Sequence, residues 1–398
     1  MDTINNNLQT PCFILDETKL TEGIEGFKSA LNSLFSSSII GYSVKTNPLP
    51  YCFKLARQYG CYAEVVSYDE YNLAIKCGFE KNHIIYNGPM KSKDTFLDAI
   101  MNGAIVNIET FRELEWLKEL PLDRIYPIGI RLNIDISQIS PEDENHENDN
   151  SRFGFSAESN DFEKALTIIS QIKQVRLAGI HTHRTSKTRS LNFYRNAIIY
   201  TQQVIENYNL NLDYWDLGGG YYGIMPYKPT FLQYTQTFAD ALRDNNKKLT
   251  IIVEPGNALT AFAFDYVSTV IDIKYHNHQY FVTTDGSRID VDPLFHKTDY
   301  FKSFEYDLAN GNMIVDSKQQ VCGFTCLEND RLFEIKEGQR LLQPGDRIRY
   351  NRVGAYTLCL TPLFIRFFPR VYLKDLNGNL SIVREEWTEK EFVSKSRY

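Results

Sequence analysis

The feature that most constrains the fold is a regular alternation of two kinds of segment between about residue 22 and residue 260. Short runs rich in β-branched residues, typical of buried strands, are separated by segments with helical apolar spacing or with enough length to hold a helix. Alternating strands and helices predict a parallel sheet, and eight such units predict a closed (β/α)8, or TIM-like, barrel. An open doubly wound sheet is the main competitor, although it usually needs fewer strands. The eight runs are residues 39–45, 62–67, 84–87, 105–108, 128–133, 177–183, 214–218 and 249–254.

A second pattern begins after about residue 265, where strand-like runs follow one another without clear helices between them. The run at residues 11–16, which precedes the first barrel strand, has the same character and is expected to join them. We therefore expect a barrel domain of residues 21–264 and an all-β domain, either a sandwich or a Greek-key-like barrel, of residues 1–20 and 265–398. The later runs are residues 266–273, 279–284, 347–350 and 370–373.

Composition argues against several classes of partner and site. A formal net charge of −7 does not suit binding to nucleic acid or to an anionic membrane. The polar N-terminus lacks a signal peptide, and no apolar run is long enough to span a bilayer. Seven scattered cysteines without a CxxC motif favour reduced thiols, a cytoplasmic location and no structural zinc, and neither HxH pair suggests a metal enzyme. The segment 141–150, with five acidic residues, is interpreted as a solvated loop inserted in the barrel.

Lys45 carries the most specific chemistry in the chain. It ends the first strand-like run, in Gly41-Tyr42-Ser43-Val44-Lys45-Thr46-Asn47-Pro48. A lysine at the end of a buried strand loses hydration, which disfavours its ammonium form and makes the amine a usable nucleophile near neutral pH. Its natural partner is an aldehyde, of which pyridoxal phosphate is the commonest. From this octapeptide alone, a lysine that simply extends to solvent is an equally good interpretation.

Other unusual residues follow the later strands, at the barrel end where active sites lie. Three consecutive glycines, Gly218 to Gly220, can wrap an anion with their N–H groups. The alternative, a tight turn, is a reasonable explanation for two glycines and less so for three in a row. Glu254 can hold a pyridine nitrogen protonated, or merely cap the next helix. His183 can stack on a flat ring, or be an ordinary core histidine. The remaining residues of this kind are Ser67, Glu70, Asn87, Arg131, Asn133, His181 and Asp216.

Together these segments resemble the alanine-racemase-fold (fold type III) pyridoxal-phosphate decarboxylases, which include the diaminopimelate, ornithine and carboxynorspermidine decarboxylases. The motifs appear in the family's order and cover nearly the whole chain, so the set is specific although most motifs are weak singly. The matching segments are Tyr42-Ser43-Val44-Lys45-Thr46-Asn47, Glu64-Val65-Val66-Ser67, Ser151-Arg152-Phe153-Gly154, His181-Thr182-His183, Leu217-Gly218-Gly219-Gly220, Glu254-Pro255-Gly256, Gly323-Phe324-Thr325-Cys326 with Asp330, and Gly354-Ala355-Tyr356.

The resemblance implies roles for the matching residues. Pyridoxal 5'-phosphate would be bound covalently to Lys45, with His183 against its ring and Glu254 at its nitrogen. Glu70 and Arg131 match a charged pair near the lysine. No metal ligand is implied. The implied cofactor-binding set is Lys45, His183, Ser186, Gly218, Gly219, Gly220, Glu254, Gly256 and Tyr356, and the candidate substrate-side set is Arg131, Asp285, Asp292, His296 and Glu328.

The resemblance also implies a homodimer with shared active sites. Lys45, His183 and Cys326 form the expected catalytic set, and Cys326 would come from the partner subunit to protonate the substrate carbon after carbon dioxide leaves. A thiol suits proton transfer near neutral pH when its surroundings tune it. The simpler interpretation of Cys326 is a buried small hydrophobic residue.

Three departures from the family pattern concern the substrate, a small-molecule amino acid. Asn257 follows Glu-Pro-Gly where these enzymes commonly carry arginine, and an amide cannot fully replace a guanidinium that binds an anion. Leu327 follows Cys326 where the diaminopimelate and ornithine enzymes carry an acidic residue, although Glu328 is one step away. Asp292 and His296 align approximately with an arginine and a tyrosine of the diaminopimelate enzymes.

The basic cluster Arg184, Lys187 and Arg189 is also unusual, and either binds an anionic substrate group or forms a solvated loop. The expected function is decarboxylation of an amino acid at the carbon that bears the amine, with the substrate unassigned. A diaminopimelate decarboxylase with a reshaped pocket is the closest alternative. A racemase would normally need a tyrosine near Cys326, and a noncatalytic cofactor-binding barrel would lack the β domain.

Overall fold

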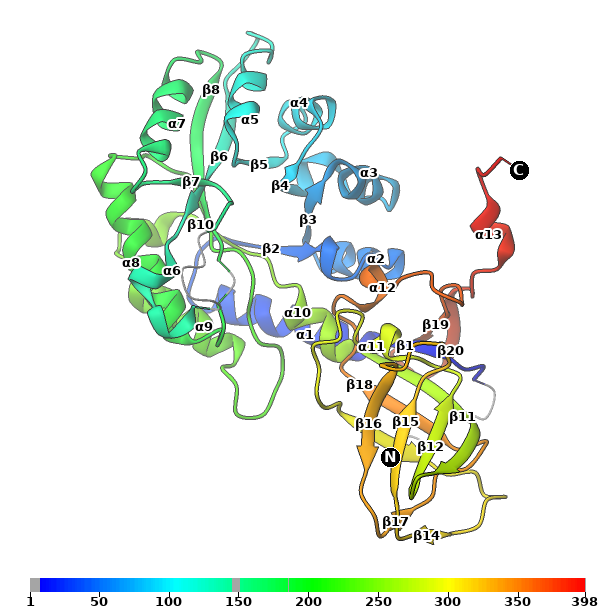
Figure 1. Cartoon of the computed structure of the whole chain (residues 1–398). Coiled ribbons are helices and arrows are strands. Elements are labelled where there is room, and N and C mark those ends of the chain that lie inside the picture. The colour runs from blue at the N-terminus through cyan, green and yellow to red at the C-terminus, as the bar shows by residue number, and fades with distance from the viewer. Residues whose placement is uncertain (1–7, 145–150, 185, 398) are drawn as a thin grey trace. The chain divides into compact units, whose positions relative to one another are not determined.

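The computed structural model describes residues 8–144, 151–184 and 186–397. The chain divides into two compact units, Thr21–Leu259 and Met1–Leu20 together with Thr260–Tyr398. Figure 1 labels most of the helices and strands of both units.

The first unit is a closed barrel of eight parallel strands. The strands pair in the order β2, β3, β4, β5, β6, β8, β9 and β10, and β10 pairs again with β2. This closure excludes the open doubly wound sheet, because an open sheet has two unpaired edges. The strands are β2 (Ser38–Ser43), β3 (Tyr62–Ser67), β4 (Ile84–Met90), β5 (Ile105–Ile108), β6 (Tyr126–Asn133), β8 (Val175–Thr182), β9 (Tyr214–Asp216) and β10 (Thr250–Val253), with the two-residue β7 (Phe155–Ser156) beside β6.

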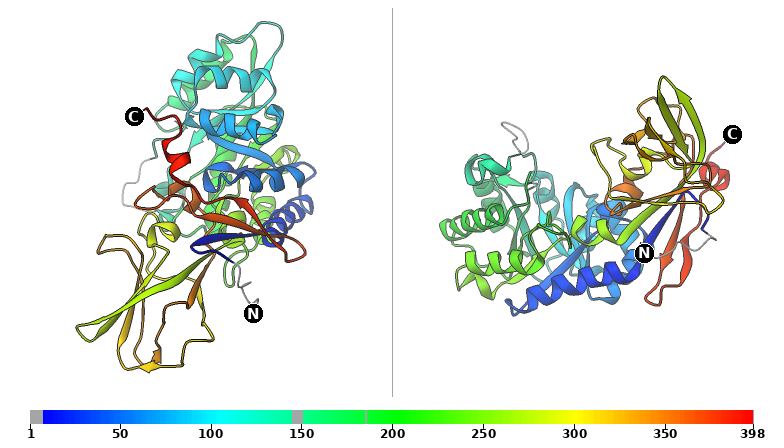
Figure 2. Two further views of the ribbon diagram at one scale, coloured as in Figure 1. Left: turned by 90° about the vertical axis from the view of Figure 1, so that its right-hand side faces the viewer. Right: turned by 90° about the horizontal axis from the view of Figure 1, so that it is seen from below.

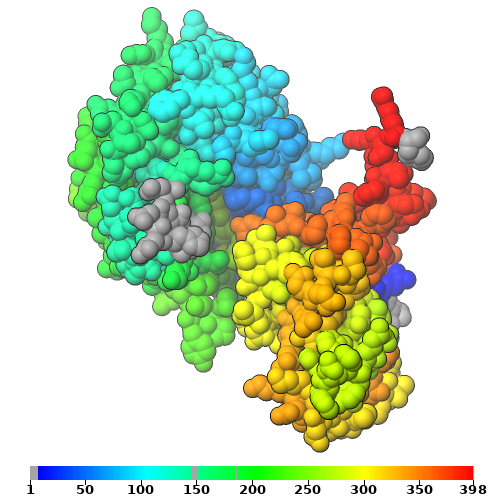
Figure 3. Space-filling view, in the orientation of Figure 1, coloured from blue at the N-terminus to red at the C-terminus, as the bar shows by residue number. Residues whose placement is uncertain are grey.

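Helices cover the outside of the barrel (Figure 2). Figure 3 shows in blue, cyan and green the side chains that form one face of this unit. Several of the helices begin at a capping side chain. Ser67, Ser92 and Ser190 each accept a hydrogen bond from the backbone N–H three residues later, which satisfies an N–H that the helix cannot pair itself. No helix in the described part of the chain is long and apolar enough to cross a bilayer. The main helices are α1 (Glu17–Asn32), α2 (Pro50–Gln58), α3 (Tyr68–Lys76), α4 (Lys93–Met101), α5 (Phe111–Leu117), α7 (Asp161–Ser170), α8 (Leu191–Asn207) and α9 (Phe231–Ala241).

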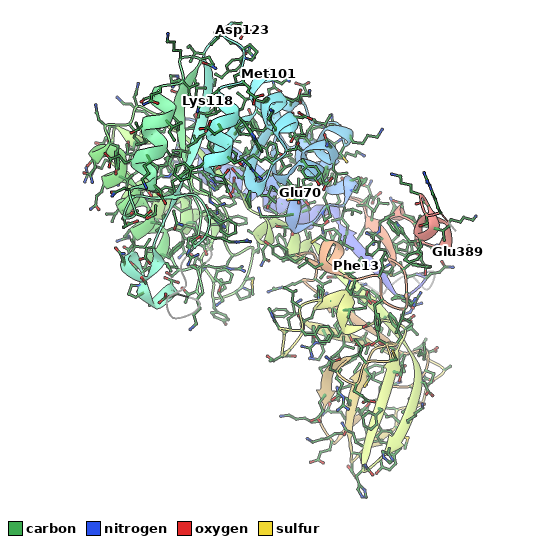
Figure 4. All side chains as sticks on the ribbon, turned by 45° about the horizontal axis from the view of Figure 1, so that its top comes forward. Phe13, Glu70, Met101, Lys118, Asp123 and Glu389 are labelled. Atoms are coloured by element: carbon green, nitrogen blue, oxygen red, sulfur yellow. The ribbon has the colours of Figure 1, made fainter. Side chains whose placement is uncertain are left out.

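The two ends of the barrel differ in what they carry. Glu70 lies in the first turn of α3, just after β3 ends, whereas Met101, Lys118 and Asp123 precede the starts of β5 and β6 and lie at the opposite end (Figure 4). The carboxyl ends of all eight strands therefore share the end marked by Glu70, which is where barrel enzymes place their active sites.

Tyr214 fills the middle of the barrel between two glycines. A Cβ atom at Gly129 or Gly179 would lie 2.2 or 2.1 Å from the tyrosine side chain, so neither position has room for another residue. The Tyr214 hydroxyl donates a hydrogen bond of 3.0 Å to Asn107 Oδ1. Tyr214 thus holds Asn107, and through it the other polar residues of the barrel interior, in place.

The acidic segment corrects one expectation. Pro141–Asp143 forms a short 3-10 helix, and Asp143 is buried rather than solvated. Its carboxylate accepts hydrogen bonds from the hydroxyls of Ser140 (2.9 Å) and Ser190 (2.8 Å), and also from Thr188. Asp143 therefore ties this segment to the loop after β8, while residues 145–150 lie outside the described residues.

The second unit is built on a nine-stranded, mostly antiparallel sheet. Its central strand β11 (Phe264–His276) pairs with β1 (Cys12–Asp16) and β18 (Arg347–Asn351) along its first half and with β12 (Gln279–Thr284) along its second. The expected N-terminal strand thus lies in this sheet. The other strands are β13 (Lys302–Glu305), β15 (Lys318–Cys322), β16 (Arg331–Ile335), β19 (Arg370–Lys374) and β20 (Leu380–Arg384), and β14 (Ile314–Val315) pairs separately with β17 (Gln339–Arg340).

Candidate active site

Lys45 lies just beyond the end of β2, in the 3-10 turn Val44–Thr46, and not in the strand itself as the sequence suggested. The Tyr42 hydroxyl donates to the carbonyl of Asn47 (2.8 Å), which fixes the turn. Lys45 Nζ lies 2.6 Å from Glu64 Oε2, on β3. Because Glu64 is buried and the lysine side chain is 38% exposed, the carboxylate holds the amine at the mouth of the barrel.

A network of buried amides joins Lys45 and Glu64 to two further acidic residues. Asn87 Nδ2 lies 2.5 Å from Glu254 Oε1 and 3.3 Å from Glu64 Oε1. Asn107 Nδ2 donates to Asn87 Oδ1 (2.8 Å) and to Asp216 Oδ2 (3.3 Å). These residues come from β3, β4, β5 and the ends of β9 and β10, so the network spans most of the barrel.

The acidic residues are close enough to share protons. Burial raises the pKa of Asp216 from 3.8 to about 7. Burial, and then the charges of Asp216 and Glu64, raise the pKa of Glu254 well above its usual range. His181, Asp216 and Glu254 offer ligand atoms within 4.8 Å of one another, so the geometry alone would also admit a metal ion. Because burial lowers the pKa of His181 well below 6.5, this imidazole is neutral beside them.

His183 and the three glycines lie together, after β8 and β9. The Gly219 N–H donates to His183 Nδ1 (3.2 Å), and a Cβ at Gly218 would lie 2.5 Å from His183 Cβ. Gly218 and Gly220 have φ values of 66° and 95°, which favour glycine. A Cβ at Gly219 would come within 2.4 Å of the Glu254 carbonyl oxygen. The glycines therefore let the backbone approach both His183 and Glu254 closely.

The predicted charged pair near Lys45 is built from other residues. Arg131 Nη1 pairs with Glu109 Oε2 (2.7 Å), and its guanidinium carbon lies 4.8 Å from the centroid of the Phe153 ring. Glu70 accepts a hydrogen bond from the Val66 N–H (2.8 Å). The ion pair that holds the lysine is formed by Glu64, a residue of the matching motifs to which no role had been assigned.

In the second unit, a buried carboxylate shapes the loop that carries Cys326. Asp330 accepts hydrogen bonds from Ser287 Oγ (2.9 Å), from the Arg288 N–H (2.9 Å) and from Thr325 Oγ1 (2.6 Å). A Cβ at Gly323 would lie 2.2 Å from the same carboxylate. Cys326 is exposed, which corrects the simple alternative of a buried hydrophobic cysteine.

Of the candidate substrate-side residues in this unit, two already have structural partners. Asp292 is buried and accepts hydrogen bonds from Arg288 Nη2 (3.0 Å) and from the backbone N–H groups of His296 and Lys297 (both 3.0 Å). Asp285 accepts from Thr10 Oγ1 (2.6 Å) and from a backbone N–H. Asp292 therefore anchors its own loop, and its role toward the substrate stays a prediction.

The remaining candidates of this unit are open to solvent. The side chains of His296 and Glu328 are exposed, and Tyr356 is 41% exposed with a φ of 62°. Sequence reasoning missed three residues of the barrel network: Glu64, Asn107 and Tyr214. Glu64 and Asn107 lie inside largely apolar strands, and that signal could have revealed them because burying a polar group costs free energy unless it is paired. Tyr214 begins its strand and gives no such signal.

Comparison with known proteins shows to which family the chain belongs. Residues 19–261 match the pyridoxal-binding domain of the pyridoxal-dependent decarboxylases. The chain belongs to this family. It is a pyridoxal-phosphate-dependent amino-acid decarboxylase, in agreement with the expected cofactor and reaction.

Three relatives illustrate the likeness in sequence. A probable chloroplastic diaminopimelate decarboxylase of rice (Oryza sativa subsp. japonica) is 28% identical over 71% of this chain and 59% of its own length. The diaminopimelate decarboxylase of Aquifex aeolicus is 26% identical over 94% of this chain and 89% of its own. The L-glutamyl-BtrI acyl-carrier protein decarboxylase of Niallia circulans is 25% identical over 98% of this chain and 94% of its own.

Solved structures show the same fold. The diaminopimelate decarboxylase of M. jannaschii superposes with a TM-score of 0.83 at 21% identity, covering 98% of this chain and 93% of that one. The arginine decarboxylase of Paramecium bursaria Chlorella virus superposes with a TM-score of 0.76 at 20% identity, covering 92% of this chain and 97% of that one.

The barrel residues fit pyridoxal phosphate. Glu254 and Asp216 hold acidic protons in a buried place, which is what a basic ring nitrogen needs as a partner. The glycines leave room that any side chain would fill, and a cavity beside them is lined by His183, Gly219 and Tyr194. When bound, the cofactor supplies an electron sink for the bond that breaks.

His183 gives a pH-dependent prediction for the apoprotein. Burial, and then the charges of Arg131 and Lys45, lower the pKa of His183 from 6.5 to about 3. The unfolded chain therefore binds a proton near pH 6.5 that the folded barrel does not, so the free energy of unfolding falls as the pH drops below about 6.5. We expect the wild type to lose about 1–2 kcal/mol more than His183→Gln by about pH 5. Urea unfolding of both proteins across this range measures the difference, and parallel pH profiles would contradict it.

Proposed function

We propose that this decarboxylase uses Lys45 to hold its cofactor and acts on an α-amino acid whose far end differs from that of diaminopimelate. The observation that carries the assignment to Lys45 is the network from Glu64 through Asn87 to Glu254. This network joins Lys45 to Glu254 at the barrel end that also carries the three glycines, which supports a site with a reactive amine, an acid for a ring nitrogen and a loop that binds an anion.

Each barrel residue has a defined task in this proposal. Glu64 orients Lys45 Nζ. Glu254 would hold a proton for the ring nitrogen, and Asp216, which hydrogen-bonds to Glu254, would support that carboxyl group. His183 contacts the ring as a neutral imidazole, because burial keeps it unprotonated. The N–H groups of the glycine loop and Ser186 would bind the phosphate, and Gly256 leaves room where a Cβ would lie 2.1 Å from Thr46 Oγ1. The phosphate role of Tyr356, a residue of the second unit, stays a prediction.

The proposal assigns the proton donor to the second unit. Cys326 Sγ delivers a proton to the substrate carbon that has lost carbon dioxide. Its exposure, and the fixed loop that Asp330 imposes, suit a thiol that must reach a ligand. Cys326 of one subunit would complete the barrel site of the partner.

Surface character supports a homodimer. Four residues between 360 and 365 are exposed although they are large and apolar, and a cluster of this kind typically marks a protein interface. Ile365 has a φ of 69°, a strained conformation for a β-branched residue that partner contacts can stabilise. The four are Leu360 (44%), Leu363 (40%), Phe364 (36%) and Ile365 (58%).

The first prediction concerns the lysine. Borohydride reduction of the holoenzyme followed by peptide mass analysis should place the cofactor on Lys45, because its amine is the one held by Glu64. Lys45→Ala should lose the reducible cofactor and carbon dioxide release, whereas Lys93→Ala, which changes an exposed lysine paired with Glu119, should keep both. A label on another lysine, or a wild type that takes up no cofactor, would refute the assignment.

The second prediction concerns the shared site. Lys45→Ala and Cys326→Ala are each expected to be inactive, but mixing them should restore about a quarter of wild-type activity, since half of the dimers become mixed and each mixed dimer has one intact site. Cys359→Ala, which alters another exposed cysteine of the same unit, is the matched control and should stay active. Subunit exchange without recovered activity would exclude sharing.

The third prediction concerns the substrate. Leu327 is exposed and uncharged, so it offers no partner for the distal ammonium of meso-diaminopimelate. An unpaired charge should lower kcat/KM for this compound by about a hundredfold to a thousandfold relative to the preferred substrate. Carbon dioxide release from meso-diaminopimelate, lysine, ornithine and arginine measures the preference.

Leu327→Glu should raise turnover of meso-diaminopimelate by about tenfold or more, because it restores a charge-assisted hydrogen bond. Leu376→Glu adds the same charge at another exposed leucine of the unit and should change nothing. If the wild type already prefers meso-diaminopimelate, the proposed substrate difference is wrong.

A further inference from the structure

Arg189 is a cation that is fixed in place, and it has no acidic partner among the residues that the structure describes. Its backbone N–H donates to Ser186 Oγ (2.9 Å), and its carbonyl accepts from the Tyr234 hydroxyl (2.8 Å). Its φ of 53° lies in the left-handed region that non-glycine residues rarely occupy. Strain of this kind persists where surrounding contacts impose it, and it collects at ligand-binding sites. The backbone therefore presents this side chain in one direction.

The guanidinium is held as firmly as the backbone. With the Asn257 amide oriented so that its oxygen faces donors, this oxygen accepts from Arg189 Nη2 (3.1 Å) and Nη1 (3.2 Å). The guanidinium carbon also lies 5.1 Å from the centroid of the Tyr222 ring. An arginine has five N–H donors, so two bonds to one neutral amide leave donors and the whole positive charge available to a ligand.

A second cation lies at the same ring. Lys228 Nζ is 4.8 Å from the Tyr222 centroid. Within residues 8–144, 151–184 and 186–397, no carboxylate lies within ion-pair distance of either Arg189 or Lys228. Two unpaired positive charges around one aromatic ring create a local field that favours an anion.

This pair of charges adjoins the barrel site through the chain itself. Tyr222 follows the glycine loop by two residues, and Asn257 follows Glu254 by three. Ser186, which fixes the Arg189 backbone, lies in the loop that begins with His183. The loops after β8, β9 and β10 therefore all contribute to the place where the guanidinium is held.

We infer that Arg189, oriented by Asn257 and assisted by Lys228, is an anion-binding residue of the active site. Its ligand is a phosphate or a carboxylate, since planar guanidinium groups bind both through paired hydrogen bonds. Two sources supply that chemistry, the phosphate of the cofactor and an acidic group at the far end of the substrate. The inference rests on the proposed function for the position of the site.

The test uses wild type, Arg189→Gln and Asn257→Leu, with Lys187→Gln as the matched control. Lys187 lies in the same loop and is exposed, so its variant removes an equal charge from the same neighbourhood. Each protein is studied as holoenzyme and after removal of the cofactor with hydroxylamine. Calorimetric titrations with inorganic phosphate and with succinate measure anion binding, and titrations with pyridoxal phosphate and pyridoxal measure the contribution of the phosphate group.

Loss of a charge-assisted pair should weaken binding of the anion by about tenfold or more in Arg189→Gln, and in the same direction in Asn257→Leu. Lys187→Gln should bind as the wild type does. Arg189 is assigned to the phosphate of the cofactor if Arg189→Gln binds pyridoxal phosphate more weakly than the wild type but binds pyridoxal equally well, and if inorganic phosphate binds the apoenzyme and not the holoenzyme. Weaker binding of succinate to the holoenzyme assigns it to the substrate.

If Arg189→Gln matches the wild type with all four compounds while keeping the same melting temperature, the inference is overturned. That result differs from failure of the proposed function, in which the wild type itself would take up no pyridoxal phosphate at Lys45.

Discussion

The rest of the site depends on keeping several acidic groups buried together at one end of a parallel barrel. Glu64, Asp216 and Glu254 would repel one another if all three were ionised and unpaired, and burial makes that repulsion stronger. The Asn87 amide lies between Glu64 and Glu254, whereas Asp216 and Glu254 hydrogen-bond to each other. Asn107 links Asn87 to Asp216 and is itself held by the Tyr214 hydroxyl. The pKa values of Asp216 and Glu254 are raised because two neighbouring buried carboxyl groups that share one proton have a lower free energy than two buried carboxylates.

This arrangement explains why Lys45 and Glu254 can have opposite tasks within one network. Glu64 contacts the exposed amine directly, while Glu254 is connected to it only through an amide. The Asn87 amide carries no net charge of its own, but the charge of Lys45 still acts on Glu254 through space and lowers the pKa of that carboxyl group. The second unit also uses a buried carboxylate that accepts hydrogen bonds from neutral donors. There, Asp330 fixes the loop that carries Cys326.

Much of the fold could be predicted because the spacing of apolar residues along the sequence indicates which residues of a strand or helix are buried. The eight strand-like runs, including the short one at residues 105–108, correspond to β2–β6 and β8–β10, since strands buried on both faces must be apolar throughout. The ends of the runs were less certain: the run ending at Lys45 loses its last two residues to a 3-10 turn. Asp143 was predicted less well, because the composition of its segment indicated exposure to solvent. Its carboxylate is instead buried, with hydrogen bonds from the neighbouring Ser140 and from Thr188 and Ser190, which are distant in sequence.

The partners of site residues could not be predicted in the same way. Sequence identifies Glu70 as an acidic residue near Lys45, but only the twist of the barrel decides that Glu64 from β3 reaches the amine. Motif matching is also incomplete at Asn257. This amide stands where related enzymes commonly carry arginine, so the motif alone suggests that the positive charge is missing from the site. The charge returns from the loop after β8, because Arg189 extends to that same amide. In a barrel whose loops converge, a function that is absent from one strand end can be supplied by another, so a substitution read in one motif says little until its neighbours in space are known.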